Sequence, residues 1–511
     1  MTTTAPAPRT NLIVAVLALG GIAVSLMQTL IIPLIPELPT LLHAAPSDAA
    51  WAITATLLAA AVATPVVGRL GDMFGKRHLL LFSLGMMVAG SVVGALSDSL
   101  TPMIVGRLLQ GASAGVIPLG ISLMRDAVPP EKLGSATALM SASLGIGGAL
   151  GLPTAALIAD HFNWHVLFWV SAALGAVVAV LVVAIVPHST VRTGGRFDVL
   201  GAIGLSGALV SLLLAISKGG DWGWSSGLTL GLFATAVIVL AAWGWWELRT
   251  TAPLVDLRVT AQPRLLLTNA SSIAIGFSMF SMSLVIPTLL QLPAVTGYGL
   301  GQSMLAAGLV MAPSGLVMLV AAPLAATIAR ARGFKLTLIV GALIVALGYA
   351  FGAVFMDEIW QLVVSTCIIG AGIGFAYGSM PALVMASVPV TETAAANSLN
   401  TLMRSLGTSV ASAVGGAILA NMTVAFGPAT VPSQTGFRVV LWIAVGAAVA
   451  AAAIAVFIPP PSANAAAAPA AAPDADAPLA DAPLSNAPLS NAPLPDASAT
   501  SGEREGEPAA R

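Results

Sequence analysis

The feature that most constrains this chain is a series of apolar runs that recurs from near residue 11 to residue 458. A helix needs about 20 apolar residues to cross the hydrocarbon core of a bilayer. Fourteen runs reach that length, at 11–36, 50–70, 78–97, 101–124, 134–159, 164–187, 199–217, 227–247, 265–291, 301–328, 336–356, 359–388, 394–421 and 437–458. Because short connections join them, the sequence predicts one all-α polytopic membrane protein without a large soluble domain.

Composition excludes the alternatives to a membrane protein. Only 8% of the residues are charged, against roughly 25% in an ordinary soluble domain, so most of the outer surface must face lipid. The net charge of −1 excludes a strongly basic nucleic-acid binder. The single cysteine, Cys367, leaves no intramolecular disulfide and no cysteine-based metal cluster. We therefore expect the lipid bilayer as a partner, and no nucleic acid, metal or cofactor.

Lysine and arginine are distributed unevenly between the two ends of the expected bundle. Fourteen of them fall at the end that holds the N-terminus and two at the opposite end. Cytoplasmic loops carry such an excess, so both termini are expected in the cytoplasm and the protein in the plasma (inner) membrane. Residues 1–10 lack the pattern of a signal peptide, so the first run counts as a span.

An internal repeat divides the spans into two groups of six. Pro65 and Pro323, Gly111 and Gly370, and the Val-Pro pairs at 128–129 and 388–389 recur in order at offsets of 258 to 260 residues. The repeat predicts a cytoplasmic N-terminus (1–10), two six-helix bundles (11–187 and 265–458) and a linker with two inserted helices (188–264). Parallel six-helix repeats with a site at their interface are typical of alternating-access transporters. Since channels usually gain symmetry from identical chains, a two-lobed monomer favours a carrier.

The composition changes at Pro459, where Ala, Pro, Ser, Asn and Asp take over and Ala-Pro-Leu recurs every five residues. Such a segment cannot bury enough apolar surface to offset the entropy of ordering it. We expect 459–511 to be a disordered cytoplasmic tail.

The loop after the second span reads Gly68-Arg69-Leu70-Gly71-Asp72-Met73-Phe74-Gly75-Lys76-Arg77. Gly68 and Asp72 share a helix face, so the glycine admits a close neighbour and the carboxylate lies at the membrane edge. There the carboxylate can pair with Arg77 or Arg125, or bind a facing helix N-terminus. An alternative is that Lys76 and Arg77 simply anchor a tight turn to the cytoplasmic side.

In this loop the chain resembles the major facilitator superfamily, whose motif G-x-x-x-D-(R/K)-x-G-(R/K)-(R/K) lies between helices 2 and 3. The sequence matches at Gly68, Asp72, Gly75, Lys76 and Arg77, and departs at Met73, where a basic residue is usual.

Two further stretches resemble the drug/proton antiporter branches of that superfamily. In helix 4, Arg107, Gln110, Gly111 and Gly115 fit R-x-x-Q-G-x-x-x-G. Helix 5 carries a glycine-rich antiporter-like stretch with Gly145, Gly147, Gly151 and Pro153, although its prolines are displaced. With fourteen spans, the resemblance implies the fourteen-helix multidrug efflux group and covers about residues 10–460.

Two arginines lie inside spans, where a charge costs at least about 2.5–3.5 kcal/mol. Arg107 should therefore face the bundle interior, unless it reaches the outer interface. Asn397, Asn400 and Arg404 form one polar stripe, which is either cavity lining or interhelical hydrogen bonding. With Gln28 they are our candidate cavity residues. Met279, Met282, Met304, Met311, Phe375 and Tyr377 are candidates for an adaptable apolar lining or for ordinary packing.

A proton-driven antiporter needs an acid that titrates in the cavity, and the acids before the tail all lie at span ends or in loops. The resembled group commonly carries an Asp in helix 1, where this chain has Met27. Asp72 is the first alternative for coupling, followed by Asp126, Glu37 and the charge of the substrate itself.

The leading hypothesis is a secondary transporter, not an enzyme, that exports amphipathic drugs or antibiotics in exchange for protons. An uptake or lipid-moving carrier is the second hypothesis. A membrane enzyme or channel is a third, but the histidines split between the two sides, and no nucleotide-binding glycine loop occurs.

Overall fold

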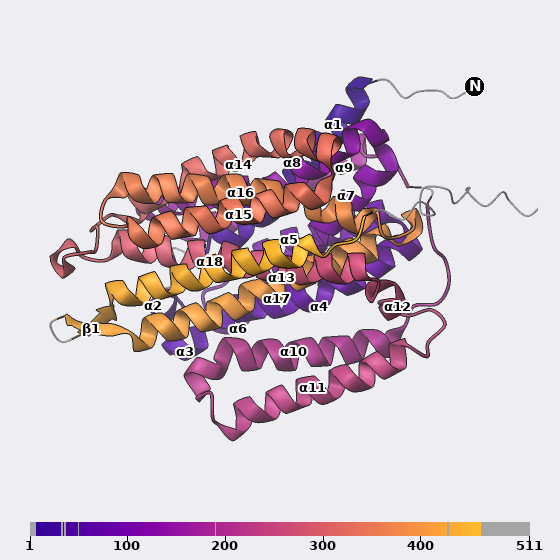
Figure 1. Ribbon diagram of the computed structural model, residues 1–511. Coiled ribbons are helices and arrows are strands. Elements are labelled where there is room, and N and C mark those ends of the chain that lie inside the picture. The colour runs from indigo at the N-terminus through magenta and orange to yellow at the C-terminus, as the bar shows by residue number, and fades with distance from the viewer. Residues whose placement is uncertain are drawn as a thin grey trace, which may run out of the picture. The chain divides into compact units, whose positions relative to one another are not determined.

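Fourteen helices long and apolar enough to cross a membrane account for most of the computed structural model (Figure 1). The structure describes residues 7–31, 34, 37–49, 51–189, 191–426 and 429–460. Within this part of the chain, the helices coincide with the predicted spans to within a few residues at each end, except that the first helix ends at Thr29 and not at residue 36. Prolines at positions 33 and 36 disfavour a longer helix there. The fourteen helices confirm the expected all-α membrane fold. The predicted tail from residue 461 and most of the predicted N-terminal segment 1–10 lie outside the described residues.

Six spans precede the two central helices and six follow them. The first six are α1 (Ala7–Thr29), α4 (Trp51–Phe74), α5 (Lys76–Ala95), α6 with α7 (Leu100–Gly111 and Val116–Ala127), α8 (Pro130–His161) and α9 (His165–Ile185). The last six are α13 (Pro263–Gln291), α14 (Met304–Arg332), α15 (Phe334–Val354), α16 (Ile359–Met385), α17 (Thr393–Asn421) and α18 (Gln434–Val456).

One glycine pair of the predicted repeat makes similar helix contacts in the structure. A Cβ atom added at Gly111 would lie 2.7 Å from the Ala59 side chain of α4, the second span of the first half. At the equivalent Gly370, an added Cβ would meet the Ser314 backbone of α14, the second span of the other half. The fourth span of each half therefore packs closely on the second through the same glycine.

The fourth span contains a break that the sequence analysis did not anticipate. A 3-10 turn, η2 (Ala112–Gly115), separates α6 from α7. A Cβ at Gly115 would lie 2.6 Å from the Val67 side chain, so the tightened turn brings α7 against α4. This break keeps Arg107 and Arg125 on separate helical segments.

The inserted spans α10 (Val199–Trp222) and α11 (Gly227–Glu247) pack on each other and lie along the lower edge of the bundle in Figure 1. An apolar cluster joins α10 to the two halves, with Leu205 and Leu209 of the insert against Leu58 of α4 and Leu402 of α17. Few residues of α11 are buried: Thr229, Ala236 and Glu247. The insert is thus attached through α10.

Short elements connect the spans. They are α2 (Leu38–Leu41), α3 (Pro46–Ala49), α12 (Leu257–Thr260), η3 (Ala294–Thr296), η4 (Val390–Glu392), and the antiparallel strands β1 (Thr423–Phe426) and β2 (Ala429–Pro432). The hairpin was not predicted. It lies at one end of the bundle and α12 at the other (Figure 1).

Two large apolar clusters form the cores of the two halves, and helix pairs α8–α14 and α4–α17 join the halves. Small residues allow the first junction: a Cβ at Gly308 of α14 would lie 2.8 Å from the Pro153 nitrogen of α8. The site described next includes the second junction and the cavity that lies between the two.

Candidate functional site

Asp72 connects the two halves at the end of the bundle that holds the loop between α4 and α5, hereafter the motif end. Its carboxylate oxygens accept hydrogen bonds from the backbone N–H groups of Ala394 (3.2 Å) and Ala395 (2.8 Å) in the first turn of α17. The first N–H groups of a helix have no partner within the helix, and its dipole favours a negative charge there. Of the partners considered for Asp72, the structure therefore places the helix N-terminus against it.

Two glycines of the loop have distinct geometric roles. A Cβ at Gly68, one turn before Asp72, would lie 2.9 Å from the Ala394 carbonyl and 2.6 Å from the Ser398 side chain, so only glycine lets α17 approach α4 this closely. Gly75 starts α5 with φ of +111°, a conformation that residues with a Cβ atom rarely adopt. The loop thus keeps Asp72 against α17 and turns the chain sharply.

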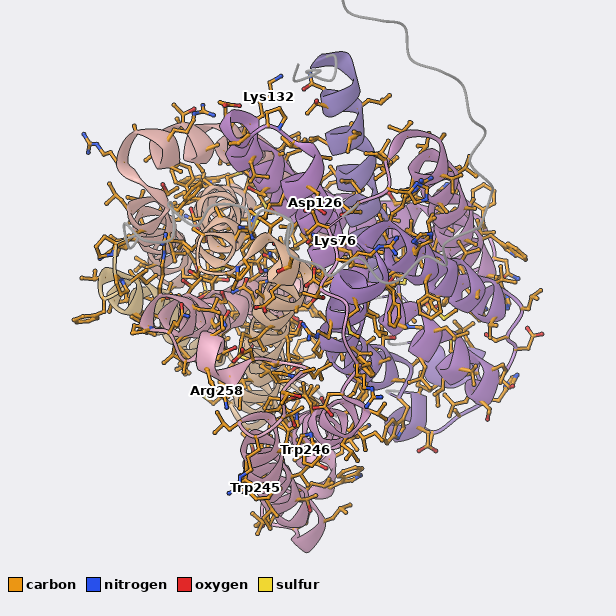
Figure 2. The ribbon with its side chains drawn as sticks, turned by 90° about the vertical axis from the view of Figure 1, so that its right-hand side faces the viewer. Lys76, Asp126, Lys132, Trp245, Trp246 and Arg258 are labelled. Carbon is orange, nitrogen blue, oxygen red and sulfur yellow. The ribbon has the colours of Figure 1, made fainter. Side chains whose placement is uncertain are left out.

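Lys76 is fully buried at the motif end and does not extend into solvent as an anchoring lysine would (Figure 2). Its Nζ lies 2.8 Å and 3.0 Å from the two carboxylate oxygens of Asp126, and 3.9 Å from Asp72. Asp126 also accepts a hydrogen bond from Ser189 Oγ at 2.6 Å. These side chains form one buried charged network within the first half.

Arg125 reaches across to the second half beside this network. It donates hydrogen bonds to Thr393 Oγ1 (2.6 Å) and to the Val388 carbonyl (3.1 Å). We call Asp72, Lys76, Arg125, Asp126 and Thr393 the motif-end lock. In this structure the lock holds the two halves together at that end.

Arg77 does not join the lock. It donates to the Val183 carbonyl at 2.6 Å and contacts the His188 ring. The guanidinium charge of Arg77 lowers the pKa of exposed His188 and so favours the neutral imidazole.

Arg107 lies in the interior of the first half, as its position in α6 predicts. It is 2% exposed, its Nε donates to the Ala52 carbonyl at 3.1 Å, and its Nη1 donates to Gln110 Oε1 at 2.6 Å. Gln110 in turn donates to Ser91 Oγ at 2.8 Å. Met27, Arg107 and Gln110 line one small cavity of about 10 Å³. The thioether of Met27 therefore occupies a position from which an aspartate could pair with Arg107.

The glycines of α8 face three different neighbours. Gly145 lies against Met318 of α14, in the other half, whereas Gly147 and Gly151 lie against Ser25 and Thr29 of α1. A Cβ at Gly148 would meet nothing within 4 Å. The predicted smooth surface is therefore divided between packing inside one half and packing across the interface.

A central cavity lies between the halves, beyond the lock. One chamber of about 180 Å³ and an adjoining one of about 160 Å³ share Gln28, Leu144, Met279 and Ser283 in their linings. Of the candidate cavity residues, Gln28 and Arg404 line the first chamber. Met279, Met282, Met311 and Tyr377 also line the cavity, whereas Met304 and Phe375 do not.

Asn397 and Asn400 do not line this cavity. Asn400 donates hydrogen bonds to Asn269 Oδ1 (2.9 Å) and Ser272 Oγ (2.7 Å) of α13, and Asn397 donates to the Thr393 carbonyl (2.9 Å). For Asn400 the structure thus shows the interhelical alternative. The polar stripe of α17 is packed near its start and reaches the cavity only at Arg404.

A second cavity, of about 280 Å³, lies toward the motif end between α4, α12, α17 and the connecting segments 193–195 and 251–256. It is lined by Pro65 and Arg69 of α4, whereas the central chamber is lined by Leu57 and Ala61 of the same helix. Leu402 of α17, which is 2% exposed, belongs to the apolar cluster that separates the central chamber from this second cavity. The two cavities therefore lie at different heights along the same two helices, α4 and α17, and are separate from each other.

Sequence reasoning missed the residues of the second half that complete the lock. Thr393 binds Arg125, and Ser398 packs on Gly68. The available signal was the repeated Val-Pro pair at 388–389, which marks the start of a helix but not its partner. No group of three or more His, Cys, Asp or Glu side chains able to hold a metal occurs within the described ranges.

Comparisons with known proteins place this geometry in a family. The model of the Major Facilitator Superfamily matches residues 17–412 and, in an overlapping match, 272–497. A tetracenomycin C resistance and export protein of Streptomyces glaucescens is 29% identical over 415 residues, covering 79% of this chain and 75% of the relative. Multidrug resistance protein 3 of Bacillus subtilis is 24% identical over 378 residues, covering 73% of this chain and 72% of that protein.

An uncharacterised transporter of the same superfamily from Mycobacterium tuberculosis is 27% identical over 419 residues, or 81% of this chain. The match spans only 60% of that relative's length. Among solved structures, the human organic anion transporter TETRAN has a TM-score of 0.64 at 14% identity and covers 88% of this chain and 100% of its own. A proton:xylose symporter has a TM-score of 0.60 at 16% identity, covering 88% and 96%. These two similarities show the fold alone.

Proposed function

Because the chain belongs to the major facilitator superfamily, we propose that it exports amphipathic drugs or antibiotics by alternating access, in exchange for protons. It is a multi-pass membrane protein of a transporter family. Relatives named for multidrug resistance and tetracenomycin export support the cargo class. The proposed partners are a small-molecule substrate, protons and the bilayer, with the chain acting as a monomer.

The observation that carries the proposal is the pair of separate cavities along α4 and α17, with the motif-end lock between the halves. The central cavity is the proposed substrate site. In the proposed cycle, α17 moves away from α4 to let cargo leave at the motif end, which breaks the two hydrogen bonds that Asp72 accepts. Opening at one end and closing at the other is the alternating-access cycle.

Asp72 is also the acid to which we assign proton coupling. An ionised carboxylate favours the N-terminus of α17, and protonation removes the charge that the helix dipole attracts. A proton on Asp72 would therefore weaken the lock and favour opening at the motif end. Helix 1 offers no acid for this task, since Met27 occupies the relevant position.

Everted membrane vesicles, supplied with a panel of fluorescent cationic and anionic dyes on their outer side, test the proposal. We expect energised vesicles to transport at least one dye, and Asp72→Asn to lower that rate at least tenfold because the amide lacks the charge. Glu131→Gln is the matched control, since Glu131 is exposed in the first turn of α8 at the same end. If Asp72→Asn transports as well as the wild type, the role of the lock is refuted.

Two further arms separate the hypotheses. Collapsing the pH gradient with nigericin should stop transport, and an unchanged rate would refute proton coupling. Transport only in right-side-out vesicles would instead establish the uptake alternative.

A further inference from the structure

Arg404 is the one charged side chain in the lining of the central cavity, within the part of the chain that the structure describes. It lies eleven residues after the first residue of α17, or about 16 Å along the helix axis, well inside the span. Neither chamber has an Asp, Glu, Lys or other Arg in its described lining. The charge of this cavity is therefore set by one guanidinium.

That guanidinium has no anionic partner among the described residues. The four ion pairs of the described chain involve Lys76, His165 and Lys218 as the cations, not Arg404. Its guanidinium carbon lies 4.7 Å from the centre of the Tyr377 ring. A guanidinium carries five N–H donors in a plane, and stacking on a ring leaves the donors at its edge available.

The surroundings of Arg404 fit an aromatic ligand. Tyr377 is held by α16 and donates a hydrogen bond from its hydroxyl to Met279 Sδ of α13 at 2.7 Å, so the ring is fixed in place. Met279, Met282, Met311 and Met318 add thioethers to the linings. Methionine adapts to irregular shapes and makes favourable contacts with aromatic rings.

A charge in a site of low dielectric discriminates strongly by sign. An unpaired cation disfavours a cationic ligand and favours one that carries an acidic group, and the planar fork of arginine matches a carboxylate in two parallel hydrogen bonds. A ligand that satisfies Arg404 therefore needs one acidic group and a flat apolar body.

We propose that the central cavity selects amphipathic aromatic anions, with the carboxylate or phenolate of the ligand paired to Arg404 and its ring system packed between Tyr377 and the methionines. This substrate class rests on the proposed function, because it takes the central cavity to be the cargo site.

Two dyes with the same three-ring scaffold and opposite charge test this inference. Fluorescein is anionic and rhodamine 123 is cationic. Binding of each dye to the purified protein in nanodiscs is measured by fluorescence anisotropy, and transport by dye movement in proteoliposomes. We expect at least tenfold tighter binding of fluorescein than of rhodamine 123 by the wild type.

Arg404→Gln should weaken fluorescein binding at least tenfold while leaving rhodamine 123 binding unchanged or tighter. Arg404→Lys should retain part of the fluorescein affinity, because it keeps the charge without the planar fork. Arg332→Gln, at the exposed end of α14, is the matched control and should change neither dye. A melting temperature for each variant shows whether it is folded.

Tighter binding of the cationic dye by the wild type would overturn the inference, as would an equal change for both dyes in a folded Arg404→Gln variant. Binding alone decides this question. If fluorescein binds as expected but no dye is transported, the export proposal fails and the anion site stands.

Discussion

Removing the Lys76 charge should destabilise the protein more than removing any exposed lysine at the same end. Lys76 is 0% exposed, and the Asp72 and Asp126 side chains near it are 0% and 8% exposed. Breaking a buried ion pair by deleting one partner costs about 3–5 kcal/mol, because the other charge is left buried without compensation. We expect Lys76→Met to fall at the lower end, about 3 kcal/mol, since Asp126 keeps the Ser189 hydrogen bond.

A double-mutant cycle isolates the interaction. Asp126→Leu alone leaves the Lys76 ammonium buried, with Asp72 at 3.9 Å as its remaining anion, and should also cost about 3 kcal/mol or more. The double variant Lys76→Met/Asp126→Leu removes both charges, and replacing a buried pair by apolar side chains is often close to neutral. The coupling energy should therefore reach at least about 2 kcal/mol.

Equilibrium unfolding in mixed micelles measures the three variants. Lys132→Met is the matched control, because Lys132 is exposed at the same end (Figure 2) and exposed substitutions usually stay within about 0.5 kcal/mol. Additive single and double variants would refute the reasoning. So would a loss for Lys76→Met no larger than that for Lys132→Met.

Three other predictions concern helix packing, a buried charge and the backbone. Gly147→Ala should destabilise the protein by about 1–3 kcal/mol, because its Cβ would lie 2.8 Å from the Ile22 carbonyl oxygen. Gly148→Ala is the control and should be neutral or stabilising, because an added Cβ meets nothing within 4 Å. Similar melting temperatures for the two variants would contradict this prediction. Met27→Asp should be tolerated, because the new carboxylate can pair with Arg107 in the same cavity. In an Arg107→Ala background it should cost about 3 kcal/mol more, because the carboxylate is then buried without a partner. Equal losses of melting temperature in the two backgrounds would argue against a shared site. Gly333→Ala should cost about 1–3 kcal/mol, because its φ of 87° with ψ of 155° is a conformation that residues with a Cβ atom rarely adopt, although nothing lies within 4 Å of the added atom. An unchanged free energy of unfolding would show that this strain is absent.

The sequence was sufficient to predict the spans, because length and apolarity alone decide whether a helix can cross a bilayer. It was also sufficient to predict the interior position of Arg107, because a charge inside a span is costly where it faces lipid. The Asp72 contact with α17 was open among three partners. Choosing among them required the approach of the two halves, which depends on Gly68 and Ser398, 330 residues apart in the chain.

The polar stripe of α17 shows why helical periodicity alone cannot predict which residues line the cavity. Asn397, Asn400 and Arg404 lie on nearly the same face. Asn397 and Asn400 are buried, with Asn400 bonded to α13, whereas Arg404 lines the cavity. Helical spacing gives the direction of a side chain and not what lies opposite it. The burial of Lys76 was missed for the same reason, because its partner Asp126 belongs to another span.

The attachment of the inserted helices mainly through α10 has a consequence for how the protein can be altered. Since few α11 side chains are buried, most of its residues face outward, and their packing requirement is only to remain apolar and helical. Sequence drift should therefore accumulate on α11 faster than on α4 or α17. For the experimenter, the outer face of α11 is the place for a spectroscopic label or an affinity handle that leaves the moving interfaces untouched.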